Sequence, residues 1–315
     1  MRTWVGLPVI AALLVVAACG PGAPPAQVAA APVLVSRDSV GHVPDDMLGT
    51  AVPDAGGAIQ QHQFASGSLG RTMPYWVYLP EGYERSARRY PVLYMLHGMG
   101  GSYEEWRAYG IFDAADRMIR SGAMAPLIIA LPQGDRAYWV DHARGGAAWG
   151  RYTAQDLVAD VDARYRTIAQ RSARAIGGVS MGAHGAFQLA LNYPDTFGVV
   201  GAHSIALRRA SSAPPFFGDV SEYAARDPMT LVRARTPLAR SLQLWVDIGD
   251  QDPWAPLARQ FHIELEQLGI QHDWREWRGD HSATYWKQHL DDYLRFYDTA
   301  LARCAAASDR TAIAR

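Results

Sequence analysis

The chain has 315 residues, which is enough for one large α/β domain or two small ones. Its content of 49% hydrophobic and 19% charged residues is that of a globular protein with a sizeable core. A formal net charge of -1, with no cluster of Lys and Arg, argues against a nucleic-acid partner.

The N-terminus has the pattern of a targeting segment. Arg2 supplies a positive charge, and the apolar stretch 5–18 is too short for a comfortable membrane span. This stretch ends in Val16-Ala17-Ala18-Cys19, which resembles a bacterial lipoprotein signal, in which the peptide is cut before a cysteine that becomes lipidated. We therefore expect residues 1–19 to be a lipoprotein-type signal peptide, with Cys19 anchoring the protein in the bacterial cell envelope outside the cytoplasmic membrane, periplasmic or on the cell surface. A plain secretory signal cut nearby is the alternative.

Three segments are expected after the signal. Residues 20–58 are rich in Ala and Pro without any period, which is typical of a tether. Residues 59–303 form the folded domain, and residues 304–315 are an Ala-rich tail. Cys304 lies in that tail, and it is the only thiol left if Cys19 is lipidated, so no intramolecular disulfide is expected.

Within the domain, short apolar runs alternate with segments of helical spacing. This alternation predicts a mainly parallel sheet with helices on both faces. After a long loop, Thr153 and Asp156 form a capping-box pattern that predicts the start of a helix. The irregular segment 207–239 is expected to form a small cap. The expected strands are 61–65, 71–79, 91–96, 126–131, 175–179, 197–202, 241–248 and 272–277.

The turn after the strand 175–179 matches the pattern G-x-S-x-G at Gly178, Ser180 and Gly182. That pattern is typical of a nucleophile elbow, a sharp turn between a buried strand and a helix that exposes the serine hydroxyl. The glycines have a steric reason, because side chains there would clash with the crossing strand and helix. A tight turn with a bystander serine would give the same pattern, so the interpretation depends on an acid and a histidine later in the chain.

Both residue types follow in the expected order. Asp252 lies on the loop after the strand 241–248, and we prefer it to Asp250 because it is further out on that loop. A helix N-cap before Pro253 is a strong local alternative for Asp252, and the two roles can coexist. His281 lies between the last strand and the last helix, where it can reach Ser180. His184 is closer to the serine in sequence but is expected to lie on the helix, and we discount it.

Two backbone amides are candidates for stabilising an oxyanion. One belongs to Met181, directly after the serine, and the other to Met99, with Gly100 as the alternative, on a glycine-bearing turn that could equally serve only the turn. No cofactor and no metal is expected, because the 10 histidines form no ligand-spaced cluster and no phosphate-binding glycine loop precedes a helix.

Several motifs together resemble one family. They lie at 78–83, 96–98, 178–182, 249–252, 279–281 and 285–286. In combination they are similar to the putative-esterase family of α/β-hydrolases, which includes enterochelin esterases, feruloyl esterases, S-formylglutathione hydrolases and mycolyltransferases. The resemblance covers residues 59–300 and implies an α/β-hydrolase fold.

The resemblance also implies roles for individual residues. Ser180 would be the nucleophile, Asp252 the orienting acid and His281 the general base, with the amides of Met99 and Met181 as the oxyanion hole. Aromatic side chains on nearby loops are candidates for lining the substrate pocket, although core packing is at least as good a reading for the first of them. These are Trp106, Tyr138, Trp139 and Trp254.

The sequence therefore favours a serine carboxylesterase that forms an acyl-enzyme on Ser180. Its substrate would be a small-molecule, polysaccharide or lipid ester, and its contact with the membrane would be through the N-terminal lipid only. Acyl transfer to a sugar or lipid alcohol, as in a mycolyltransferase, is the enzymatic alternative. A non-catalytic binding lipoprotein on the same fold is the alternative from another class.

Overall fold

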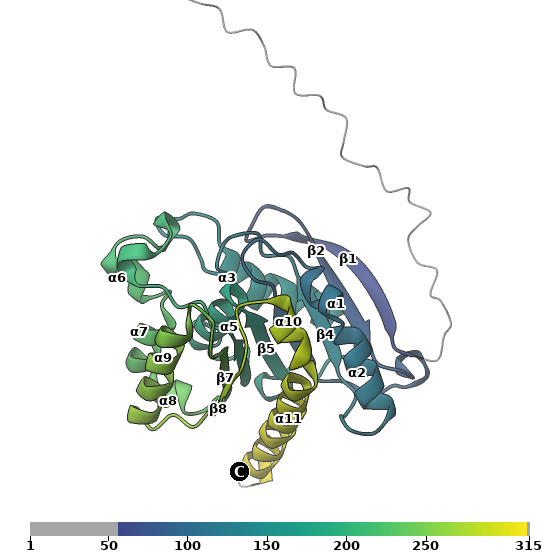
Figure 1. The fold of residues 1–315 in the computed structure, drawn as a ribbon. Coiled ribbons are helices and arrows are strands. Elements are labelled where there is room, and N and C mark those ends of the chain that lie inside the picture. The colour runs from purple at the N-terminus through teal and green to yellow at the C-terminus, as the bar shows by residue number, and fades with distance from the viewer. Residues whose placement is uncertain (1–55, 314–315) are drawn as a thin grey trace, which may run out of the picture. The chain divides into compact units, whose positions relative to one another are not determined.

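A single eight-stranded sheet, with the strand order β1-β2-β4-β3-β5-β6-β7-β8, organises the computed structural model (Figure 1). The structure describes residues 56–313, so the predicted signal peptide, Cys19 and most of the predicted tether lie outside the described residues. The strands are β1 (Ala58–Ser66), β2 (Arg71–Leu79), β3 (Val92–Leu96), β4 (Ile128–Pro132), β5 (Arg174–Val179), β6 (Val199–His203), β7 (Gln243–Gly249) and β8 (Asp273–Trp277). β1 and β2 form an antiparallel hairpin, β2 pairs antiparallel with β4, and all pairs from β4 to β8 are parallel.

Helices cover both faces of this sheet. They are α1 (Glu105–Tyr109), α2 (Ile111–Arg120), α3 (Trp149–Arg151), α4 (Val158–Arg164), α5 (Met181–Asn192), α6 (Val220–Ala224), α7 (Pro228–Ala234), α8 (Thr236–Ala239), α9 (Ala255–Gln267), α10 (Ala283–Gln288) and α11 (Leu290–Ile313). A π-helical segment, η3 (Tyr152–Leu157), joins α3 to α4. None of the helices in the described part of the chain has both the length and the apolar content needed to cross a membrane.

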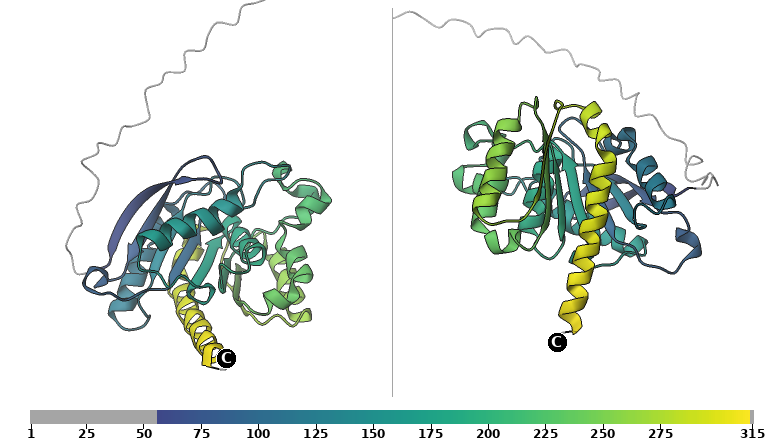
Figure 2. Two further views of the ribbon diagram at one scale, coloured as in Figure 1. Left: turned by 180° about the vertical axis from the view of Figure 1, so that it is seen from behind. Right: turned by 60° about the horizontal axis from the view of Figure 1, so that its bottom comes forward.

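The sheet separates two hydrophobic cores because its central strands are apolar on both faces. In β3, Tyr94 and Leu96 point to one core, while Leu93 and Met95 point to the other. The first core is completed by α4, α5 and α9, and the second by α1, α2 and α11. Figure 2 shows α11, in yellow, running along its face of the sheet. The predicted α/β architecture is confirmed.

The start of one helix differs from the prediction. Thr153 lies inside a helical run that begins at Trp149, and its hydroxyl donates to the Trp149 carbonyl oxygen (2.8 Å). Asp156 does not cap the helix either, because its carboxylate accepts hydrogen bonds from the hydroxyl of Ser66 (2.6 Å) and the amide of Ser68 (2.8 Å) in the β1–β2 turn. The capping-box prediction is wrong, since both side chains have partners that the local pattern does not reveal.

Two other segments carry more helix than expected. The segment 207–239 contains α6, α7 and α8. The last helix, α11, continues to Ile313 and so runs through the described part of the expected tail at 304–315. Cys304 is half-buried on that helix.

Candidate active site

The carboxyl ends of β3, β5, β6, β7 and β8 meet at one edge of the sheet, and the loops that leave them carry the candidate site. Ser180 follows β5 directly and precedes α5, with φ 57° and ψ −114°. A positive φ is unusual for a residue with a side chain. Its amide donates to the His203 carbonyl oxygen at the end of β6 (2.9 Å), which helps to hold the strained turn.

The two glycines of the G-x-S-x-G motif are required by close backbone contacts. A Cβ atom at Gly182 would lie 2.3 Å from the Leu96 carbonyl oxygen, and one at Gly178 would lie 2.7 Å from the same oxygen. Real Cβ atoms do not approach backbone oxygens so closely. The elbow therefore packs against the end of β3 only because these positions have no side chain.

Three side chains from separate loops form one chain of hydrogen bonds at this edge. His281 Nε2 lies 2.9 Å from Ser180 Oγ, and His281 Nδ1 lies 2.6 Å from Asp252 Oδ2. The Asp252 side chain is fully buried, whereas 22% of the His281 side chain is exposed. This arrangement lets His281 accept a proton from the serine while Asp252 holds the other ring nitrogen.

Asp250 occupies a different position from Asp252. Its Oδ1 accepts a hydrogen bond from the Gly279 amide (2.9 Å), and the residue is exposed. Further bonds join the two loops, since the Asp250 amide donates to the Trp277 carbonyl oxygen (2.8 Å) and the Gln251 amide to that of Gly279 (2.8 Å). We call this set of bonds the β7–β8 loop clamp. It fixes the loop of Asp252 against the loop of His281.

The N-cap alternative for Asp252 is met only in part. Asp252 Oδ1 accepts a hydrogen bond from the Trp254 amide (2.8 Å), but α9 begins at Ala255, so Pro253 is not its first residue. The same carboxylate therefore serves the turn with one oxygen and His281 with the other. His184, discounted above, lies on α5 and is buried, with Nε2 donating to the Arg226 carbonyl oxygen (2.8 Å).

The turn after β3 lies against the nucleophile. A Cβ atom at Gly98 would lie 3.5 Å from Ser180 Cβ. The Gly98 amide already donates to Glu105 Oε2 (2.5 Å). Within the described residues, the amides of Met99 and Met181 have no protein acceptor. Two donors without a protein acceptor thus lie on the residues that follow Gly98 and Ser180, which is what the predicted oxyanion hole needs.

His97 holds this turn in place. Its Nδ1 donates to the Gly98 carbonyl oxygen (2.8 Å), and its Nε2 accepts a hydrogen bond from the Gly134 amide (2.9 Å). Burial lowers the pKa of His97. The neutral ring is required by the geometry, because a second ring proton would break the bond from Gly134.

A family model described as "Putative esterase" matches residues 66–297 of the chain. The chain belongs to this esterase family. The family resemblance predicted from the sequence is confirmed, and so is the expectation of a carboxylic ester hydrolase, at the level of the family.

Known proteins similar to this esterase-family chain are also named as esterases. Esterase Rv1288 of Mycobacterium tuberculosis is 33% identical over 147 residues, which are 45% of this chain and 31% of that protein. An endo-1,4-beta-xylanase/feruloyl esterase of Xylanibacter ruminicola is 32% identical over 158 residues, covering 46% of this chain and 21% of that protein. The match thus covers less than a third of either relative. A solved ferulic acid esterase structure, 25% identical, superposes with a TM-score of 0.71 over 78% of this chain and 100% of that one.

The aromatic residues expected to line the substrate pocket of this esterase-family chain divide into two groups. Trp106, Tyr138 and Trp139 are at most 1% exposed, so in this structure they present no surface to a substrate. The indole nitrogens of Trp106 and Trp139 donate to the carbonyl oxygens of Leu96 (2.9 Å) and His97 (3.3 Å). These residues support the site from behind, and the expectation that they line it is wrong. Trp254 is half-buried and keeps an accessible surface.

A buried network beneath the site was not foreseen. Asp247, on β7, is fully buried, and its Oδ1 lies 2.7 Å from both His203 Nδ1 and Trp245 Nε1. Its Oδ2 accepts hydrogen bonds from the hydroxyls of Tyr285 and Tyr293 (both 3.1 Å). The signal was available, because a charged residue inside an apolar strand needs an internal partner. The network supports β6 at the residue whose carbonyl oxygen receives the Ser180 amide.

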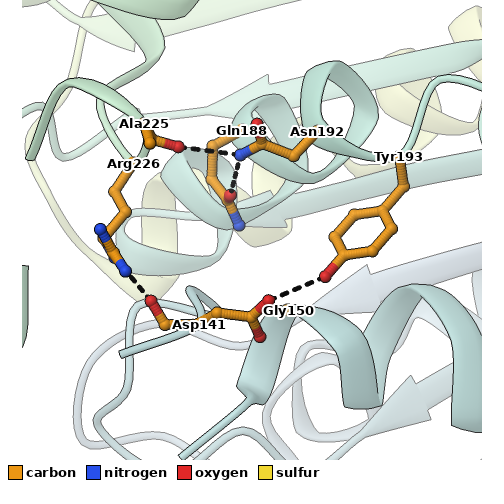
Figure 3. Close-up of a pocket in the computed structure, with 7 residues that line it drawn as sticks. All are labelled: Asp141, Gly150, Gln188, Asn192, Tyr193, Ala225 and Arg226. Carbon is orange, nitrogen blue, oxygen red and sulfur yellow. Dashed lines mark hydrogen bonds between the residues drawn. The ribbon is translucent and has the colours of Figure 1, made fainter. Parts of the chain in front are cut away.

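A pocket of about 200 Å³ lies at the C-terminal end of α5 (Figure 3). Its lining residues are Asp141, Gly150, Gln188, Asn192, Tyr193, Ala225 and Arg226. The Tyr193 hydroxyl donates to Asp141 Oδ2 (2.9 Å), and Arg226 Nε donates to the Asp141 carbonyl oxygen (2.5 Å). No member of the Ser180–His281–Asp252 chain lines this pocket. Its hydrogen bonds tie the loop at Asp141 and the segment 225–226 to the end of α5.

Proposed function

We propose that this protein is a serine carboxylesterase. The observation that carries the proposal is the continuous hydrogen-bonded chain from Asp252 through His281 to Ser180, which lies at a strained elbow. A serine hydroxyl is a poor nucleophile until an oriented base removes its proton, and this geometry provides such a base. The family membership and the names of the relatives support the same activity.

In the proposed reaction, Ser180 Oγ attacks the ester carbonyl carbon while His281 Nε2 takes the hydroxyl proton. The amides of Met99 and Met181 stabilise the oxyanion, and Asp252 stabilises the charged imidazole. The tetrahedral intermediate then collapses, the C–O bond to the alcohol breaks, and His281 returns the proton to the departing alcohol. Water attacks the acyl-enzyme with the same histidine as base, which releases the acid and restores the serine.

A fluorophosphonate probe tests this proposal directly. We expect the probe to label the wild type and not Ser180→Ala, and Ser180→Ala to lose hydrolysis of 4-nitrophenyl butyrate while its melting temperature stays close to that of the wild type. Ser282→Ala is the matched control for losing a hydroxyl beside the site, because Ser282 directly follows His281 and caps α10, and its hydroxyl bonds to Asp280 rather than to His281. A folded wild type that neither takes the label nor hydrolyses the ester would refute the proposal.

We also propose that the enzyme is a lipoprotein held outside the cytoplasmic membrane through Cys19. The support is the sequence pattern before Cys19 and the Ala/Pro-rich stretch after it. In a bacterial host, the full-length wild type should incorporate radiolabelled palmitate and sediment with membranes, and Cys19→Ala should do neither. Equal labelling of the two proteins would exclude this anchor.

A further inference from the structure

Arg208 lies on the segment that leaves β6 and passes the nucleophile. Two residues earlier, the Ala206 amide donates to the Ser180 carbonyl oxygen (3.2 Å). The guanidinium carbon of Arg208 lies 4.5 Å from the centroid of the Trp254 ring, and the Trp254 amide donates to Asp252 (2.8 Å). Arg208 is therefore connected through near neighbours to both the nucleophile and the acid.

The guanidinium is held by residues from separate segments. Arg208 Nε donates to the Tyr138 hydroxyl (2.6 Å), which lies on the long loop before α3. The Trp254 ring covers one face of the guanidinium. The main chain is fixed as well, since the Tyr223 hydroxyl of α6 donates to the Arg208 carbonyl oxygen. The direction of the side chain is thus set before any ligand arrives.

Arg208 has no anionic partner in the described part of the chain. No carboxylate there forms an ion pair with it, whereas Arg233 and Arg259 pair with Glu264 and Glu276 on the surface. Its Nη1 and Nη2 donate no hydrogen bond to a described residue, and neither is among the buried polar atoms that lack a partner, so both face solvent. Burying a guanidinium even by half without a counterion is unfavourable.

We propose that Arg208 binds a carboxylate group carried by the ester substrate, and this inference rests on the proposed esterase function. The two free Nη groups form one edge of a planar fork that matches the two oxygens of a carboxylate. With Nε and one face of the group already engaged, that edge is the side left for a ligand. The carboxylate belongs either to the acyl part or to the alcohol part of the ester.

Two matched substrate pairs test the proposal and distinguish the two sources. The first pair is mono-(4-nitrophenyl) glutarate and its methyl ester, in which the carboxylate lies on the acyl part. The second pair is 4-acetoxybenzoate and its methyl ester, in which the carboxylate lies on the alcohol part. We expect wild-type kcat/KM to favour the carboxylate over the methyl ester by about tenfold or more in one pair, and Arg208→Gln to remove that preference. Arg209→Gln, at an exposed neighbour, should keep it.

Product inhibition of the wild type provides a test that needs no variant. Glutarate should inhibit about tenfold more strongly than butyrate, which lacks the second carboxylate, or 4-hydroxybenzoate about tenfold more strongly than its methyl ester. A wild type that hydrolyses the methyl esters but prefers the carboxylate in neither pair would overturn the role of Arg208 and leave the esterase function standing. A wild type that hydrolyses none of the four esters and takes no fluorophosphonate label would refute the esterase function itself.

Discussion

Replacing Asp252 by Asn tests the site at its most specific point. Asp252 is buried and uses both oxygens, one for the Trp254 amide and one for His281 Nδ1. An Asn side chain has only one oxygen. If that oxygen keeps the bond from Trp254, the amide nitrogen faces His281 Nδ1, which must then be the unprotonated nitrogen. The ring proton moves to Nε2, and His281 can no longer accept the proton of Ser180.

The size of the effect follows from the two ways in which the site can respond. Turning the Asn amide over restores the useful tautomer but sets two buried donors against each other, which costs about 1–3 kcal/mol. Losing the carboxylate also removes a charge-assisted hydrogen bond to the imidazolium of the transition state, worth about 1.5–3 kcal/mol. At about 1.36 kcal/mol for each factor of ten, kcat should fall by about 10² to 10⁴.

The assay is steady-state hydrolysis of 4-nitrophenyl butyrate, with Asp250→Asn as the matched control. The Asn oxygen at position 250 can still accept the bond from the Gly279 amide, so this control should lose less than about tenfold. Both variants should melt close to the wild type. A loss below tenfold in Asp252→Asn, or an equal loss in Asp250→Asn, would refute the assignment of the acid.

Three further predictions concern the support of the site. Asp247→Ala should lower the free energy of unfolding by about 3–5 kcal/mol, or the melting temperature by about 10 °C, because it leaves the buried donors of His203 and Trp245 without an acceptor. A melting temperature within about 3 °C of the wild type would contradict this. Gly182→Ala should reduce kcat/KM about 100-fold or more, since its Cβ would force the elbow away from Leu96 by about 1 Å, and near-normal kinetics would be inconsistent with the contact. Burial lowers the pKa of His97 in the folded protein below its value of 6.5 in the unfolded chain. The folded state is therefore favoured at a pH above 6.5, where the ring is neutral in both states. That contribution is lost as the pH falls below about 6.5, by up to about 1.4 kcal/mol per unit. Because burial lowers the pKa of other histidines too, among them His184 and His289, denaturant unfolding at pH 5, 6 and 7.5 should show a smaller decline in His97→Gln than in the wild type, and an equal decline would contradict the assignment.

The sequence was informative wherever a local pattern has one physical cause. Gly178 and Gly182 mark the elbow because no Cβ fits against the end of β3, and the order of strands and helices is visible in the apolar runs. The positions of Asp252 and His281 after late strands follow from the same logic, since the carboxyl ends of parallel strands share one edge. Their catalytic roles remain predictions that the variants above test.

Partners distant in sequence were the features that local patterns could not supply. The local pattern predicts a capping role for Asp156, but in the fold its carboxylate accepts a hydrogen bond from the β1–β2 turn. The sequence predicts Trp106 and Trp139 in the pocket because their segments come near the site, yet the position of a segment does not say which way an indole points. Arg208 carries no motif at all, and its setting depends on two other loops that lie 70 and 46 residues away.

The β7–β8 loop clamp has a consequence for how such an enzyme can diverge. The clamp holds the loops of Asp252 and His281 in a fixed position relative to each other. The segments 133–148 and 207–239 form none of the hydrogen bonds of the clamp. Changes in those segments that keep Gly134, Trp139 and Arg208 in place would therefore alter what is recognised without moving the acid relative to the base. Selectivity can then change while the proton relay stays as it is.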